Sequence, residues 1–283
     1  MTITTTISYA VSVGVADIRR DPDPTSELVT QALMNTSASG AESDGEWTHV
    51  TLSDYTGWIR TNHLQEPVVK GFCKIGASCA TPLPLVAVVN CVYTPLYTHA
   101  QGDGAHETLY LSTVLPLVDT SDAERVQVAL PGEKEGWLRR SDIAIRQNTC
   151  PYPRTPINVV TDHARAFLGR DYLWGGTSWE GIDCSGLVQL CYRMGGYMLP
   201  RDGDQQHDFL PHSVERTAMR EGDLIFFGST QITHVALALN HEQYIHAEGQ
   251  NYDHVVINSF NPSAENYYSR LDEIVWDLKR VVV

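Results

Sequence analysis

Residues 181–188 read Gly-Ile-Asp-Cys-Ser-Gly-Leu-Val, and they place one cysteine, Cys184, where a polar loop gives way to a helical pattern. Apolar residues recur at near-helical spacing directly after it, at Leu187, Val188, Leu190 and Cys191. A thiol at a helix N-terminus lies among unpaired backbone N–H groups at the positive end of the helix dipole, and both favour the nucleophilic thiolate. The alternative is a buried structural cysteine, which is the commoner role of a lone Cys. The polar neighbours Asp183 and Ser185 favour the reactive role.

Two downstream histidines fit the rest of a thiol-hydrolase site, which needs a base beside the nucleophile and a third group that orients the base. His234 opens one expected strand, and His246 lies in the next. A hairpin centred on Asn240 brings the two histidines opposite each other on one face, provided that an odd-numbered loop or a bulge closes it. The alternative is a pair of ordinary surface histidines. Their occurrence together with Cys184 favours catalysis.

The residues around these groups form a series of motifs along the chain. They are residues 172–176 (Tyr-Leu-Trp-Gly-Gly), 183–186 (Asp-Cys-Ser-Gly), 199–201 (Leu-Pro-Arg) with Gln205, 222–227 (Gly-Asp-Leu-Ile-Phe-Phe), 234–235 (His-Val) and 245–247 (Ile-His-Ala). From about residue 155 to the C-terminus the series resembles the NlpC-type cysteine peptidases, papain-like hydrolases of bacterial cell-wall peptides. The resemblance implies an α+β papain-like domain over residues 155–283, with helices packed on an antiparallel sheet. It implies Cys184 as nucleophile, His234 as its base and His246 as the residue that orients the base.

The sequence ahead of this domain predicts two small all-β domains, at residues 1–70 and 83–150. Short alternating runs separated by Gly and Asp turns indicate strands. The Gly-Trp-Ile of residues 57–59 returns as Gly-Trp-Leu at residues 136–138, which indicates a degenerate repeat. Residues 147–156 contain three prolines and form the expected linker. The family branch that matches best, the γ-D-glutamyl-L-diamino acid endopeptidases, carries two bacterial SH3-like barrels ahead of its catalytic domain.

Asp183 and Ser185 bracket the nucleophile, and a carboxylate beside a hydroxyl suits a substrate ammonium group. The alternative is that they only cap the helix, which is their usual role at such positions. In the resembling endopeptidases the matching pair binds the free N-terminal L-alanine of the peptide, and a Tyr and a Glu of the first barrel close the pocket. Tyr55 and Glu27 are the residues expected in these two roles, and the alternative for both is ordinary barrel surface.

Three further residues match family positions near the cleft. The backbone N–H of Cys184 supplies one oxyanion donor, and the resemblance makes the Tyr172 hydroxyl the second. Trp174 and Arg201 are expected to contact substrate. The alternatives are a core position for Trp174 and an ion pair with a nearby carboxylate for Arg201.

Composition limits the partners. A formal net charge of −14 over 283 residues disfavours nucleic acid and anionic wall polymers, which need clustered Lys and Arg. No run approaches the roughly 20 apolar residues of a membrane span, and no signal peptide is recognised, so we expect no membrane partner and a cytoplasmic location. None of the six cysteines forms a Cys-x-x-Cys pair; a zinc site at Cys73 and Cys79 is the weaker alternative to free thiols, so neither a metal nor a cofactor is expected.

The expected function is therefore a cysteine endopeptidase that hydrolyses the γ-D-glutamyl–diamino acid bond of free cell-wall muropeptides with an N-terminal L-alanine, in peptidoglycan recycling. One alternative is a papain-like amidase or acyltransferase that acts on another acyl substrate. The other is a wall-binding module whose catalytic domain is degenerate. An intact set of Cys184, His234 and His246 argues against the second alternative.

Overall fold

The structure is a computed structural model that describes residues 7–68 and 85–281. The described chain divides into two compact units, Met1–Pro151 and Tyr152–Val283. The first unit is all-β, and the second combines helices with an antiparallel sheet. The predicted fold class, all-β domains followed by an α+β domain, is confirmed.

Within residues 7–68, seven strands form one antiparallel sheet in the order β3-β2-β6-β5-β4-β1-β7. The strands are β1 (Ile7–Val11), β2 (Val15–Arg19), β3 (Leu28–Leu33), β4 (Ser37–Asp44), β5 (Trp47–Thr51), β6 (Thr56–Arg60) and β7 (Leu64–Gln65), with the 3-10 turn Thr61–His63 before β7. Alternating apolar residues such as Ile18, Val50 and Ile59 are fully buried in its core. A Cβ at Gly57 would lie 2.7 Å from the Arg19 carbonyl oxygen, so this strand position requires glycine.

The second sheet repeats the first with every strand number raised by seven. Within residues 85–151 the order is β10-β9-β13-β12-β11-β8-β14. The strands are β8 (Leu85–Val89), β9 (Tyr93–Tyr97), β10 (Ala105–Tyr110), β11 (Val114–Asp119), β12 (Arg125–Leu130), β13 (Lys134–Arg139) and β14 (Ile143–Gln147), with the 3-10 turn Arg140–Asp142 before β14. Gly136 repeats the role of Gly57, because its Cβ would lie 2.7 Å from Leu96 in the core. The predicted repeat is confirmed.

The two sheets of the first unit share contacts. Met34, at the end of β3, is buried in the core of the second sheet. The Asn35 side chain donates a hydrogen bond of 2.9 Å to the Val114 carbonyl oxygen. Gly132 N–H donates to the carbonyl oxygen of Glu66 at 3.0 Å. These contacts account for the grouping of both sheets in a single compact unit.

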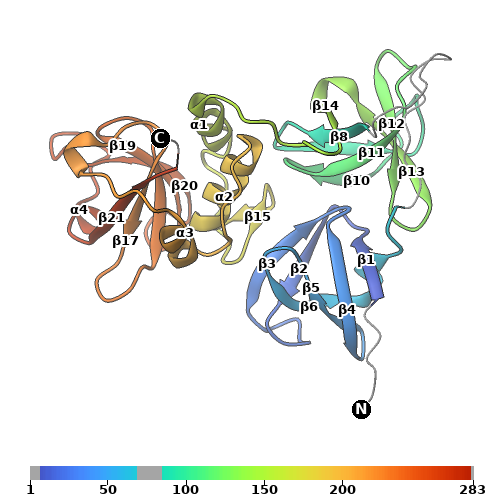
Figure 1. The fold of residues 1–283 in the computed structure, drawn as a ribbon, viewed down its shortest axis with the longest axis horizontal. Helices are drawn as coiled ribbons and strands as arrows, with labels where there is room; N and C mark the ends of the chain where they lie inside the picture. The colour runs from blue at the N-terminus through green and yellow to red at the C-terminus, as the bar shows by residue number, and fades with distance from the viewer. Residues whose placement is uncertain (1–6, 69–84, 282–283) are drawn as a thin grey trace. The chain divides into compact units, whose positions relative to one another are not determined.

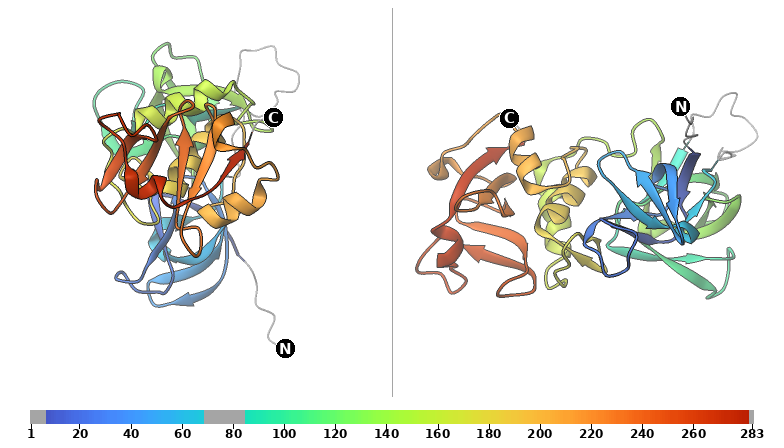
Figure 2. Two further views of the ribbon diagram at one scale, coloured as in Figure 1. Left: turned by 90° about the vertical axis from the view of Figure 1, so that its left-hand side faces the viewer. Right: turned by 90° about the horizontal axis from the view of Figure 1, so that it is seen from below.

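In the second unit, the helices of residues 157–209 lie on one side of a five-stranded antiparallel sheet in the order β20-β19-β18-β17-β21, and the short helix of residues 269–272 lies on the other side (Figures 1 and 2). The strands are β17 (Asp223–Phe227), β18 (His234–Ala238), β19 (Gln243–Glu248), β20 (His254–Ser259) and β21 (Val275–Arg280). The helices are α1 (Ile157–Ala166), α2 (Cys184–Met194), α3 (Gly203–Phe209) and α4 (Ser269–Asp272), with a 3-10 turn at Arg216–Ala218 and a small hairpin of β15 (Thr177–Ser178) and β16 (Gly181–Ile182).

Helix α2 is the element that connects the helical layer to the sheet. It packs against α1 on one side and against β18 and β19 on the other. Its residues are almost all buried, with Leu187, Cys191 and Tyr192 completely inaccessible. The start of α2 therefore lies beside strands β18 and β19, which carry His234 and His246.

Candidate active site

Cys184 is the first residue of α2, as the sequence predicts. Asp183 precedes it in extended conformation and caps the helix, accepting the Gly186 N–H at 2.7 Å. A Cβ at Gly186 would lie 2.4 Å from the Gly176 carbonyl oxygen, so glycine is needed where loop and helix start approach. Cys184 is half-buried, and the backbone N–H groups of Val235 and Ser185 lie close enough to its sulfur to lower its pKa. The thiol thus lies against the start of β18.

The two histidines lie on one face of the β18–β19 hairpin. His234 Nε2 and His246 Nδ1 are 2.8 Å apart, and the ring planes are inclined by 75°. The hairpin register pairs Leu237 with Ile245, so its centre is His241 rather than the predicted Asn240. The histidines are therefore diagonal neighbours instead of directly opposite, which is still within contact distance on one face. The loop has an odd number of residues, as expected. Within it, Asn240 Oδ1 accepts hydrogen bonds from the backbone N–H groups of Glu242 and Gln243.

A residue that the sequence analysis missed completes this row. Asn258 on β20 places its Oδ1 2.8 Å from His246 Nε2, and both side chains are buried, with His246 fully inaccessible. The available signal was a lone amide in the otherwise apolar run Val-Val-Ile-Asn of residues 255–258. His234 is half-buried, so the row extends from a partly accessible imidazole into the core.

Burial dominates the protonation of these groups. It raises the pKa of the Cys184 thiol to about 12, and the Asp183 charge adds to the increase. The backbone N–H groups of Val235 and Ser185 act in the opposite direction and lower this pKa. Burial lowers the pKa of His246 to about 4, and burial together with the His246 and Arg270 charges lowers the pKa of His234 well below its usual range. Desolvation thus opposes the effect of the helix terminus on the thiol pKa, and the expected resting thiolate stays a prediction. Burial therefore shifts both pKa values toward the neutral thiol and the neutral imidazole.

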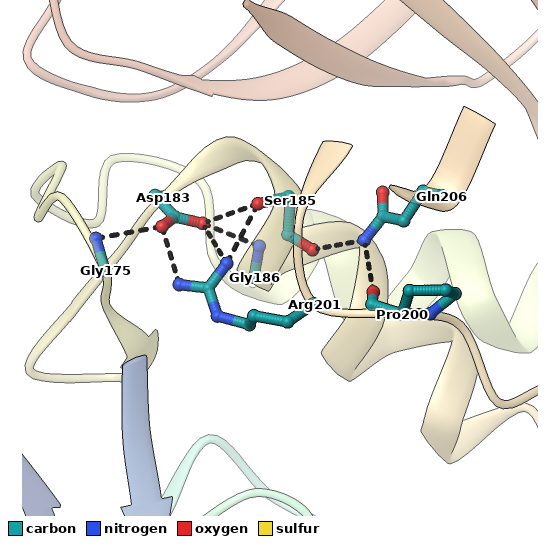
Figure 3. A network of polar contacts seen from close by, with 7 residues as sticks. All are labelled: Gly175, Asp183, Ser185, Gly186, Pro200, Arg201 and Gln206. Carbon is teal, nitrogen blue, oxygen red and sulfur yellow. Dashed lines mark hydrogen bonds and ion pairs between the residues drawn. The ribbon is translucent and has the colours of Figure 1, made fainter. Parts of the chain in front are cut away.

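Arg201 lies beneath the nucleophile in a buried polar network (Figure 3). Its guanidinium is 1% exposed and forms two hydrogen bonds with the Asp183 carboxylate, Nη2 to Oδ2 at 2.6 Å and Nη1 to Oδ1 at 3.0 Å. Asp183 also accepts the N–H groups of Gly175 and Gly186, and Ser185 Oγ donates to it at 3.3 Å. The capping alternative for Asp183 and the ion-pair alternative for Arg201 are thus both realised, and substrate contacts by these residues stay predictions.

Gln206 extends this network (Figure 3). Its buried side-chain amide donates to the carbonyl oxygens of Ser185 at 3.0 Å and Pro200 at 2.9 Å. Gln205, which the sequence analysis placed in the motif, is exposed and bonds to Asp202 instead. Because α3 begins two residues after Arg201, the helical phase turns the second glutamine of the pair inward.

Tyr172 is half-buried beside Cys184. Burial raises the pKa of its hydroxyl, and the charges of Cys184 and Asp183 raise it further, so the group is a neutral O–H donor. The β19–β20 turn packs against its ring, because a Cβ at Gly249 would lie 2.6 Å from Tyr172 Cε1. Trp174 is 61% exposed, which excludes the core alternative for this residue.

The other predicted pocket residues belong to the first unit. Tyr55 packs against the core of the first sheet, and Glu27 forms an ion pair of 2.7 Å with Arg20. Their roles at the substrate stay predictions. In the described ranges no three His, Cys, Asp or Glu side chains are grouped as metal ligands, and Cys73 and Cys79 lie outside these ranges. None of the helices in the described part of the chain combines the length and the apolar character that crossing a bilayer requires.

A helix-borne cysteine beside a strand-borne pair of histidines, in an α+β domain of this topology, defines a papain-like cysteine peptidase. A model of the NlpC/P60 family matches residues 169–273, and a model of the bacterial dipeptidyl-peptidase Sh3 domain matches residues 18–64. The chain belongs to the NlpC/P60 family and is a cysteine peptidase.

Individual relatives agree with this assignment. Dipeptidyl-peptidase 6 of Lysinibacillus sphaericus is 34% identical over 247 residues, which cover 82% of this chain and 84% of the relative. A γ-D-glutamyl-L-lysine dipeptidyl-peptidase of Bacillus cereus is 28% identical over 78% of this chain and 67% of its own length. The crystal structure of an NlpC/P60 family protein from Bacillus cereus superimposes with a TM-score of 0.83 at 21% identity, covering 98% of this chain and all of that one, and it supports the fold.

Proposed function

We propose that the protein hydrolyses the bond between γ-D-glutamate and a diamino acid in free muropeptides that carry an N-terminal L-alanine, as a step of peptidoglycan recycling. The observation that carries the hydrolytic part is the packing of α2, which begins at Cys184, against β18 and β19, together with the His234–His246 hydrogen bond. The bond to be cut is inferred from relatives named γ-D-glutamyl-L-lysine dipeptidyl-peptidase, which match most of the chain.

The proposed chemistry starts from a neutral pair, the state toward which burial shifts the pKa values of Cys184 and His234. The Cys184 sulfur attacks the amide carbonyl carbon while its proton passes to His234, so the charged pair exists only as the reaction proceeds. The Cys184 N–H and the Tyr172 hydroxyl stabilise the oxyanion. His234 then gives its proton to the leaving amine. In the second half it takes a proton from water, which hydrolyses the thioester and restores the thiol.

The proposed amine pocket lies at Asp183 and Ser185. Both oxygens of Asp183 already bind Arg201 and backbone N–H groups. A substrate ammonium that binds Asp183 must therefore donate to a carboxylate oxygen that already accepts hydrogen bonds from this network. The Ser185 hydroxyl lies beside that carboxylate. The predicted roles of Glu27 and Tyr55, which belong to the first unit, are to be tested by substitution. Trp174, next to Gly175, offers an exposed ring to the rest of the peptide.

The cytoplasm is the proposed location. The four cysteines that the structure describes, Cys91, Cys150, Cys184 and Cys191, are free thiols, as a reducing compartment maintains them. Fractionation of the producing cells, with the protein detected by antibody, tests this directly. Recovery outside the cytoplasm would contradict both the location and the recycling role.

The activity test compares four substrates by mass spectrometry: L-Ala-γ-D-Glu-diaminopimelate, the lysine analogue, the N-acetylated tripeptide and intact sacculi. We expect release of the diamino acid from the free tripeptides only, since an acyl group on the alanine nitrogen removes the ammonium charge that the proposed pocket binds. Cys184→Ala is the control. Equal rates on all four substrates would refute the amine pocket and the recycling role. Cleavage of amides without a γ-D-glutamyl group would favour the broader amidase alternative.

A further inference from the structure

Asn258 makes three polar contacts that fix the orientation of its side-chain amide. Its Nδ2 donates to the Asn266 carbonyl oxygen at 3.0 Å and to the Tyr252 hydroxyl at 3.1 Å, and its Oδ1 lies 2.8 Å from His246 Nε2. A backbone carbonyl can only accept a hydrogen bond, so the nitrogen of the amide must face Asn266. The oxygen is thereby left facing His246.

This orientation determines where the protons lie on both imidazoles. An acceptor at Oδ1 requires His246 to carry its proton on Nε2, and neutral His246 then has a bare Nδ1. The bare Nδ1 accepts from His234 Nε2 at 2.8 Å, so His234 also carries its proton on Nε2. The remaining ring atom, His234 Nδ1, is bare and able to take a proton. The opposite arrangement would set two acceptors, His246 Nε2 and the Asn258 oxygen, against each other.

The surroundings keep both rings neutral. Both histidines have lowered pKa values because they are buried. Arg270 and Glu248 are the charged groups that act on the pair, and they form an ion pair with each other at 3.9 Å, so their effects on the imidazoles oppose one another. Tyr244, whose ring centroid is 5.3 Å from that of His246, has a raised pKa and stays neutral.

We propose that Asn258 is a positioning residue that locks His246 and His234 in their Nε2–H tautomers, so that His234 presents a bare Nδ1 as the base for Cys184. The proposal rests on the cysteine-peptidase chemistry of the proposed function and is independent of which amide is cut. Without the amide oxygen, nothing in the described contacts of this row selects between the two tautomers. A fraction of the enzyme would then carry a proton on the atom that must accept one.

The test uses the full chain with ¹⁵N-labelled histidine, whose ring nitrogen shifts report the tautomer without any substrate. Wild type should show Nε2–H on both His234 and His246. Asn258→Leu should populate both tautomers and reduce kcat about tenfold, the equivalent of one buried hydrogen bond, with little change in KM. The alkylation of Cys184 by iodoacetamide should slow in parallel, because the thiol must lose its proton to displace iodide.

Two further variants separate positioning from a merely structural role. Asn258→Asp keeps an acceptor toward His246 but sets its second oxygen against the Asn266 carbonyl, so it should lose stability while it retains the Nε2–H tautomers, recovers activity relative to Asn258→Leu and moves the acid limb of kcat/KM to higher pH. Tyr252→Phe removes a contact on the nitrogen side but leaves the Asn266 carbonyl, so both tautomers should persist with a smaller loss than in Asn258→Leu.

Specific results would overturn the proposal. An Nδ1–H signal for His246 in wild type would do so, as would unchanged tautomers and alkylation in Asn258→Leu. If Asn258→Leu does not fold, the wild-type spectrum and the pH profile of Asn258→Asp still decide. Failure of the γ-D-glutamyl assay alone would leave these substrate-free measurements in force and would refute only the proposed substrate.

Discussion

Replacement of Arg201 by Met tests the energetic role of the buried network beneath the nucleophile. The change removes the guanidinium of Arg201, a residue that is 1% exposed, and leaves the carboxylate of Asp183, a residue that is 7% exposed, without its cation. Methionine fills much of the space of the apolar stem. Breaking a buried ion pair by removing one partner typically destabilises by about 3–5 kcal/mol. Asp183 keeps the N–H groups of Gly175 and Gly186, so we expect the lower end, about 3 kcal/mol.

The assay must report on the second unit alone, because a chain of two compact units need not unfold in a single transition. Hydrogen exchange followed by mass spectrometry, across a urea series, gives the free energy of opening for peptides that cover residues 175–190. The matched control is Arg216→Met, which breaks the more exposed ion pair with Asp272 and should cost about 1 kcal/mol or less.

A double variant completes the test. Asp183→Asn combined with Arg201→Met removes both charges and should be more stable than Arg201→Met alone, since no uncompensated carboxylate is left in the core. A loss below about 1 kcal/mol for Arg201→Met, or a double variant that is no better than this single one, would refute the account of Asp183 as a desolvated charge.

Three further outcomes are expected. Cys184→Ala should abolish hydrolysis while its urea midpoint stays near that of wild type, because only a half-buried sulfur is lost; surviving turnover would remove Cys184 as nucleophile. His246 has a pKa of about 4 in the folded protein against its ordinary 6.5, so the unfolded state binds a proton at a higher pH than the folded state does. The free energy of unfolding of the second unit should therefore fall by on the order of 3 kcal/mol as the pH falls from 6.5 toward 4. Flat stability over that range, measured by the same exchange assay, would contradict a neutral buried His246. Gly249→Ala should displace the Tyr172 ring and so lower kcat more than it changes KM. In a Tyr172→Ala background the same change should lower kcat no further. An equal loss of kcat in that background would show that Gly249 does not act through Tyr172.

Local patterns in the sequence determined the secondary structure and the repeat. The apolar spacing after Cys184 predicted a helix that begins at this residue, and α2 begins there. The recurrence of Gly57 at Gly136 predicted two related β domains, and the two sheets share one strand order. These features follow from periodicities of a few residues, which the chain encodes without reference to distant segments.

The tertiary structure decided the properties that depend on segments far apart in the chain. Asp183 and Arg201, 18 residues apart, become an ion pair only because the loop before α3 passes beneath the start of α2. Asn258 becomes part of the histidine row because β20 pairs with β19, a register that no local pattern fixed. The pKa of the Cys184 thiol is raised for the same reason. A helix terminus is visible in the sequence, but the loss of water around a side chain is set by whatever else packs there, and desolvation is here the larger effect.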